Sequence, residues 1–123
     1  MPNILSPESI HNILSEINPN VTLDDSAILY LQKVLTPLSQ EVPNDKMEIQ
    51  QYIRAKFPAH YAQSLISHYV RRVLSKPNDL IYQKDAIIDY IIADLLDRAS
   101  SSEIIDDKLL ERIMNENKFY VPI

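Results

Sequence analysis

The chain of 123 residues contains no glycine, no cysteine and no tryptophan. Without glycine it cannot form the Gly-rich loops that bind phosphates and dinucleotides, and hairpin-rich β folds become improbable. Without cysteine it has neither disulfides nor thiolate metal sites, which favours a reducing compartment. No apolar run approaches the ~18 residues of a membrane-spanning helix, and residues 1–6 do not resemble a signal peptide. These absences predict a soluble, intracellular, helical protein.

Charge is unevenly distributed along the chain. The net charge of −5 is the sum of three segments. Residues 1–53 carry −5, residues 54–76 carry +5, and residues 77–123 carry −5. The middle segment contains no acidic residue. The basic band consists of Arg54, Lys56, Arg71, Arg72 and Lys76. It is either an ordinary solvated surface or a contact zone for phosphate or an acidic partner.

A short pattern occurs twice in the sequence. Asp45-Lys46 and Lys56-Phe57 recur as Asp107-Lys108 and Lys118-Phe119, with an offset of 62 residues. Before each copy lies a long apolar helical pattern, and before each long pattern lies a shorter helical pattern. A repeat of about 60 residues predicts two units of short, long and short helices. We expect residues 1–58 and 59–123 to form these units and to share one compact domain.

The first unit has one irregular feature. A long amphipathic helix is predicted over 23–42, with Thr22 and Asp25 as a capping box. Pro37 lies inside this helix, where a proline removes a backbone hydrogen bond and clashes with the preceding turn. We therefore expect a kink or a break near Thr36.

The second unit has a more regular pattern. Its first helix carries one predicted buried stripe, formed by Leu65, Ile66, Tyr69, Val70, Val73 and Leu74. A long helix is predicted over 81–99, followed by a short strand at 103–105 and a last helix capped by Asp106. The tail over 118–123 is apolar enough to dock against the rest of the protein.

Two stretches of the second unit resemble the histone family. Residues 81–99 look like the central helix of a core histone, and residues 104–110 are similar to its second loop and third helix. The resemblance covers residues 62–117 well and residues 6–57 more loosely. It implies an all-α fold of two tandem histone folds, packed as an intramolecular handshake pseudo-dimer whose long helices cross. An ordinary six-helix bundle is the alternative.

The resemblance also implies a candidate nucleic-acid site. Histones bind DNA through basic residues on first helices and paired loops, and the candidate phosphate contacts here are Arg54, Lys56, Arg71, Arg72 and Lys76. The loops at 40–42 and 100–103 lack the basic residue that histones place there. So few contacts predict weak, salt-dependent binding to double-stranded DNA.

Two functions follow from this comparison. The first is a DNA-associated role in a chromatin or transcription-type assembly, located in a nucleus or nucleoid. The second is an acidic protein–protein interaction module without DNA, located in the cytoplasm and binding other histone-fold or regulatory proteins. Either function is compatible with oligomers.

No pattern in the sequence indicates an enzyme, a metal or a cofactor. Asp85 and Asp89 lie one helical turn apart, as expected on a solvated helix face. His60 and His68 lack a carboxylate at metal-ligand spacing. The tyrosines within helical patterns are expected to pack at the edge of the core rather than stack on bases.

Overall fold

The computed structural model describes residues 3–120, which are mostly helical, as the all-α prediction requires. The elements in chain order are α1 (Pro7–Ile17), β1 (Thr22–Leu23), α2 (Asp25–Glu41), α3 (Lys46–Lys56), α4 (Ala59–Ser75), α5 (Leu80–Lys84), α6 (Ala86–Ala99), β2 (Ile104–Ile105) and α7 (Asp107–Glu116). No helix within residues 3–120 is both long and apolar enough to cross a membrane.

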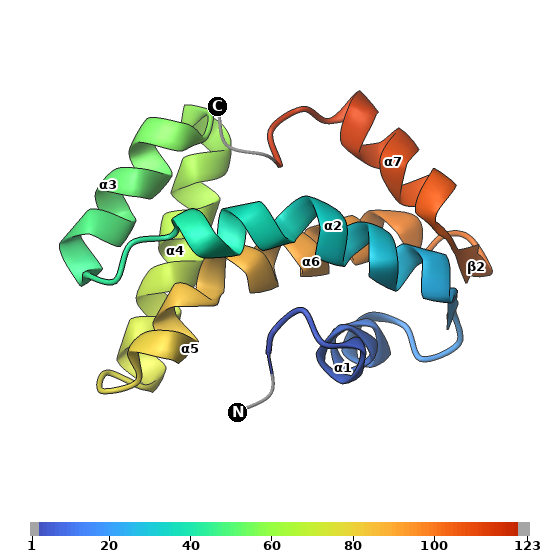
Figure 1. The fold of residues 1–123 in the computed structure, drawn as a ribbon, viewed down its shortest axis with the longest axis horizontal. Helices are drawn as coiled ribbons and strands as arrows, with labels where there is room; N and C mark the ends of the chain where they lie inside the picture. Colours follow the sequence, from blue (N-terminus) through green and yellow to red (C-terminus); the bar gives the residue numbers. More distant parts are fainter. Residues whose placement is uncertain (1–2, 121–123) are drawn as a thin grey trace.

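The helices α2 and α6 lie at the centre of the molecule (Figure 1). α1 packs on α6, and α7 packs on both central helices. α3 and α4 pack on each other at one end of the long axis, and β2 lies at the opposite end. Elements from the first half of the chain therefore contact elements from the second half throughout the core.

A two-residue parallel pairing joins the loop after α1 to the loop after α6. The Thr22 amide donates to the Glu103 carbonyl at 3.0 Å, and the Asp24 amide donates to the Ile105 carbonyl at 2.9 Å. Leu23 and Ile105 point into the core, whereas Thr22 and Ile104 are exposed. The predicted strand is therefore present at 104–105. It pairs with β1, whose residues lie 82 positions earlier in the sequence.

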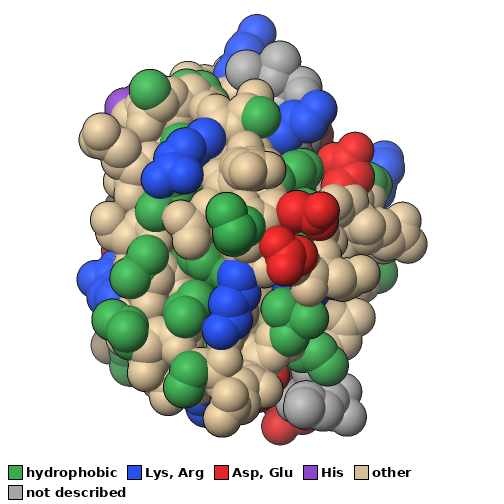
Figure 2. Space-filling model, turned by 90° about the vertical axis from the view of Figure 1, so that its left-hand side faces the viewer, with side chains coloured by type: hydrophobic (Ala, Val, Ile, Leu, Met, Phe, Trp, Pro, Cys, Tyr) green, Lys and Arg blue, Asp and Glu red, His purple; other side chains and the backbone are tan. Residues whose placement is uncertain are grey.

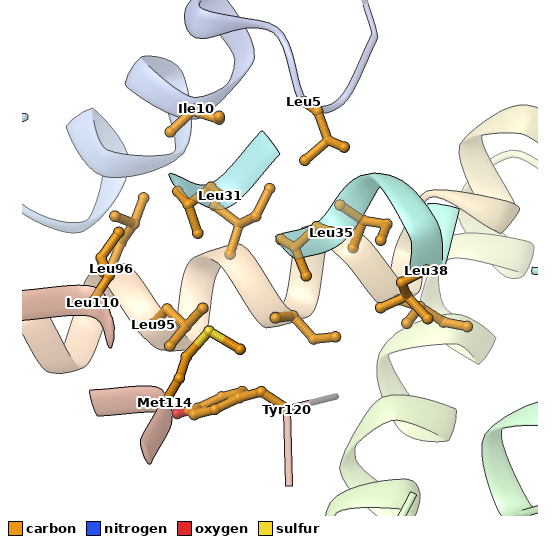
Figure 3. Packing of buried hydrophobic residues seen from close by; sticks show 14 of the residues in the cluster. Leu5, Ile10, Leu31, Leu35, Leu38, Leu95, Leu96, Leu110, Met114 and Tyr120 are labelled. Atoms are coloured by element: carbon orange, nitrogen blue, oxygen red, sulfur yellow. The ribbon is translucent and has the colours of Figure 1, made fainter. Parts of the chain in front are cut away.

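The core follows the apolar faces of the central helices. Figure 3 shows Leu31, Leu35 and Leu38 of α2 in one cluster with Leu95 and Leu96 of α6. All five are at most 3% exposed. Ile10 of α1 and Leu110 and Met114 of α7 complete this cluster. Each central helix buries a leucine-rich face, so its stability depends on packing against the other helices rather than on the helix alone.

The start and middle of α2 differ from the prediction. The helix continues through Pro37 to Glu41, so the alternative of a break near Thr36 is wrong. Pro37 faces solvent and its neighbours Leu35 and Leu38 are buried, so packing outweighs the lost hydrogen bond. The N-cap is Asp24, whose carboxylate accepts from the Ser26 amide, and not Thr22.

The second half also departs from the short–long–short plan. α4 has 17 residues, as many as α2. The predicted helix over 81–99 divides at Asp85 into α5 and α6, although the Asp85 amide still donates to the Ile81 carbonyl at 3.0 Å. Asp106 caps α7 as predicted, accepting from the Leu109 amide at 2.9 Å.

The apolar tail docks as far as the structure describes it. Tyr120 is fully buried, and its ring centroid lies 5.6 Å from that of Tyr61. The Phe119 ring lies 4.7 Å from Tyr61 and also contacts His60. These aromatic contacts attach the end of the chain to α4. Residues 121–123 of the predicted tail lie outside the described part.

Candidate interaction surface

The basic band is brought to one end of the molecule by the α3–α4 hairpin. Arg54 and Lys56 lie in the last turns of α3, and Phe57-Pro58 connects this helix directly to α4, which carries Arg71 and Arg72. Lys76 follows α4 immediately. Figure 2 shows this end with separate Lys and Arg side chains among exposed hydrophobic ones.

The five candidate cations do not share one environment. Arg54, Lys56, Arg71 and Lys76 are exposed. The side chain of Arg72 is only 14% exposed and faces the protein. Four of the five positions are thus accessible to a partner, and the fifth belongs to the packing of the fold.

Arg72 joins α4 to α5 and α6. Its guanidinium donates to the Tyr82 carbonyl through Nε at 3.2 Å and Nη2 at 2.9 Å. It also stacks 3.7 Å from the centre of the Tyr82 ring and pairs with Asp89 at 3.4 Å. Asp89 accepts a second contact from His68 at 2.8 Å. Because these partners use its donors and its planar face, Arg72 has little left for a phosphate.

Two further lysines lie at this end, Lys46 as the first residue of α3 and Lys84 as the last residue of α5. Lys46 donates through Nζ to the Pro77 carbonyl at 3.2 Å, and Lys84 contacts the Asn44 side chain. The buried Gln83 fixes the same loop, donating through Nε2 to the carbonyls of Lys76 and Pro77, both at 3.0 Å. Sequence reasoning missed Lys84, because only the folded chain places it beside the loop after α2.

Exposed hydrophobic side chains accompany the cations. We call this surface the basic end; its exposed apolar members are Met47, Val70, Leu74, Leu80 and Ile81. Val70 and Leu74 lie one turn apart on α4 and are 41% and 76% exposed. Their predicted burial is therefore wrong. α4 buries the neighbouring stripe of Ala62, Leu65 and Tyr69, and nothing in the described chain covers the adjacent face.

The charge of this end opposes that of the remainder. Residues 44–85, which include α3, α4 and α5, carry seven basic and four acidic groups, giving +3. All other residues carry five basic and thirteen acidic groups, giving −8. Residues 44–85 and the remainder of the chain therefore carry net charges of opposite sign.

The opposite end is acidic and also has exposed apolar groups. We call this surface the acidic end; its acidic members are Asp24, Asp25, Glu103, Asp106, Asp107 and Glu111, and it also carries the exposed Lys33 and Lys108. Leu29 and Ile104 are 66% and 59% exposed there. Leu29 lines an open groove of about 460 Å³ between α2 and α7, together with Asp107 and Glu111.

Two of the acidic side chains singled out in the sequence are held in ion pairs. Asp85 and Asp89 do not share a free helix face, because Asp89 is held by Arg72 and His68. Asp94 pairs with Arg98 at 3.6 Å. Within residues 3–120, no three His, Cys, Asp or Glu side chains are grouped so that they could hold a metal ion.

Tyrosine placement agrees with core packing. Tyr61 and Tyr69 are buried, and Tyr52 and Tyr90 lie partly buried against the core. Burial is the main cause that raises the pKa of Tyr61 far above its ordinary value. All four rings therefore pack within or against the core, as predicted.

Asp85 provides a test of the electrostatics at the junction of α5 and α6. Burial raises the pKa of its carboxyl above the ordinary 3.8, while the Arg72 guanidinium acts in the opposite direction. The charged form is therefore destabilised in the folded state at neutral pH. We expect Asp85→Asn to raise the melting temperature at pH 7.

The pH dependence of this gain has a defined sign. The gain should be complete above the raised pKa of the folded state and should disappear below the ordinary value of 3.8, where Asp85 is neutral in both states. Thermal unfolding of both proteins between pH 3 and pH 8 measures it. A gain that persists unchanged at pH 3 contradicts the assignment to charge burial.

No protein-family model matches this chain, and no curated protein sequence matches it either.

Proposed function

We propose that the chain is a histone-fold pseudo-dimer that acts as a protein-interaction module and binds an acidic partner through its basic end. Four features support the histone-fold part. The central helices α2 and α6 are in contact, the loop before α2 pairs with the loop after α6, and α1 and α7 pack across the halves. At the other end, the loop after α2 lies beside the loop after α4, where Lys46 contacts Pro77. At each end of the molecule, a loop from one half of the chain therefore lies beside a loop from the other half. A handshake of two histone folds requires this near-symmetric arrangement.

One observation supports the interaction role most strongly. The exposed cations at the basic end are interleaved with exposed apolar side chains, among them Met47 and Leu74 at 71% and 76%. A surface that contacts only phosphates needs no exposed apolar side chains, whereas protein interfaces combine an apolar centre with a polar rim. The +3 charge of residues 44–85 favours an acidic partner.

DNA association remains a second candidate because of four side chains. Arg54, Lys56, Arg71 and Lys76 are all exposed, and the stretch 54–76 carries no acidic residue. Such a set would neutralise only a few phosphates, so binding would be weak and would fall steeply with salt. The acidic end would repel the rest of a long duplex.

Two probes on the intact protein separate these roles. The first is a synthetic amphipathic helical peptide with leucine on one face and glutamate on the other, and the second is a short DNA duplex. Titration of each into isotope-labelled protein is followed by amide chemical shifts. We expect the peptide to shift the signals of residues 70–76 and Met47, and Arg71→Ala to weaken it about two- to five-fold.

The outcomes are distinct. The DNA role would be favoured instead if the duplex bound more strongly than the peptide, if its affinity fell steeply with salt concentration, and if Arg71→Ala reduced that dependence on salt. Shifts confined to the acidic end, or no shifts with either probe, would overturn the proposed use of the basic end. Glu8→Ala, on the exposed face of α1, serves as the control and should leave both titrations unchanged.

A further inference from the structure

The two ends of the molecule match each other in chemistry. Every large hydrophobic side chain that is exposed within residues 3–120 lies at one of them: five at the basic end, and Leu29 and Ile104 at the acidic end. Cations outnumber carboxylates around the first group, and carboxylates outnumber cations around the second. From this we infer that the basic end of one copy docks on the acidic end of a second copy, so that the chain associates head to tail. This inference rests on the proposed function of the basic end and names its partner.

Charge complementarity is the first argument for a second copy as the occupant. Residues 44–85 carry +3, and the acidic end has six carboxylates against the two cations Lys33 and Lys108, so two copies attract each other when opposite ends meet and repel when like ends meet. The two ends lie at opposite extremes of the long axis (Figure 1), so one molecule cannot satisfy both within itself.

The shape of the acidic end provides the second argument. The groove between α2 and α7 is open, and its lining includes Leu29, the carboxylates of Asp107 and Glu111, and the single cation Lys33. On the partner copy, Val70 and Leu74 project from one face of α4, with Arg71 next to them in the sequence. An apolar helix edge flanked by a cation fits a groove with an apolar residue and carboxylates on its lining.

The geometry of such a contact has a consequence for assembly. Two different surfaces meet, so each added copy leaves one basic end and one acidic end unoccupied. The association therefore continues beyond the dimer and stops only if the assembled copies close into a ring. We therefore expect a series of dimers, trimers and longer species that grows with concentration and shrinks with added salt.

Sedimentation velocity of the full chain and of two neutralising double variants tests this inference. Arg54→Ala with Arg71→Ala weakens the basic end, and Glu103→Ala with Glu111→Ala weakens the acidic end. All four side chains are exposed, so folding should be retained, and circular dichroism checks this. At low salt and near-millimolar concentration we expect the unmodified chain to form the series and each double variant alone to stay predominantly monomeric.

The mixture of the two variants is decisive. Each variant keeps the end that the other has lost, so an equimolar mixture should form 1:1 dimers and little that is larger. Glu8→Ala should associate like the unmodified chain. A monomeric unmodified chain, a species that stops at a symmetric dimer, or a mixture that stays monomeric would each overturn the head-to-tail contact. If the chain stays monomeric while the acidic peptide still binds to residues 70–76, the basic end binds a different protein and the proposed function stands.

Discussion

Replacing Leu95 with alanine should lower the free energy of unfolding by about 2–5 kcal/mol. Leu95 lies in the middle of α6, is fully buried, and belongs to the cluster in which α6 meets α2 and α7 (Figure 3). The substitution removes three carbon atoms from a site enclosed by three helices, and such a site cannot collapse to fill the space. Denaturant unfolding followed by circular dichroism measures the change.

A matched control exists in the other central helix. Leu29→Ala is the same chemical change on α2, but Leu29 is 66% exposed, so its effect should remain within about 0.5 kcal/mol. Equal effects of the two substitutions would contradict the assignment of the leucine faces. The unfolding transition should also remain a single step, because one core contains residues from both halves of the chain.

Loss of the Arg72 side chain should be nearly as damaging, at about 2–4 kcal/mol. Arg72→Ala leaves the Tyr82 carbonyl without its donors and leaves Asp89 paired only with His68. It also removes a guanidinium stacked on the Tyr82 ring. These contacts connect α4 to α5 and α6, so the loss affects the packing of the α3–α4 hairpin.

The adjacent residue provides the control. Arg71→Ala alters an exposed arginine and should change the free energy of unfolding by no more than about 0.5 kcal/mol, while it weakens binding at the basic end. Arg72→Lys should recover only part of the stability, because an ammonium group cannot reproduce the two-pronged hydrogen bond or the stacking. A larger stability loss in Arg71→Ala than in Arg72→Ala would contradict the positions of the two side chains.

The fold was predictable where the sequence pattern is long and regular. The apolar faces of α2, α6 and α7 were recognisable because side chains three and four residues apart lie on one helix face. The Asp106 cap was recognisable because an aspartate preceding a helix satisfies its free amides. Pairing of β1 with β2 could not be seen, since two residues have no period and their partner is distant in sequence.

The candidate surface was predicted less completely. The density of Arg and Lys between 54 and 76 indicated a basic region, but nothing in the sequence distinguished Arg71 from Arg72. Only the approach of α5 decides that one arginine packs inward and the other faces solvent. Likewise, Val70 and Leu74 continued the buried stripe in spacing, yet the helices that cover Leu65 and Tyr69 leave the adjacent face of α4 exposed.

In this fold the two halves of the chain interlock. The pairing of the loop before α2 with the loop after α6 offers the sharpest test of this arrangement. Thr22 and Ile104 are register partners and both are exposed, so a Thr22→Cys, Ile104→Cys variant can form a disulfide without disturbing the core. The natural chain has no cysteine, so every cross-link comes from the introduced pair. Thr22→Cys with Leu74→Cys, at the far end of the molecule, is the matched control.

Oxidation under dilute conditions, read by non-reducing electrophoresis and mass spectrometry, gives the result. We expect nearly complete intramolecular cross-linking of the 22–104 pair, none of the 22–74 pair, and a raised unfolding midpoint for the cross-linked protein. A 22–104 pair that stays reduced, or that reacts no faster than the control, would mean that the two halves of the chain do not interlock.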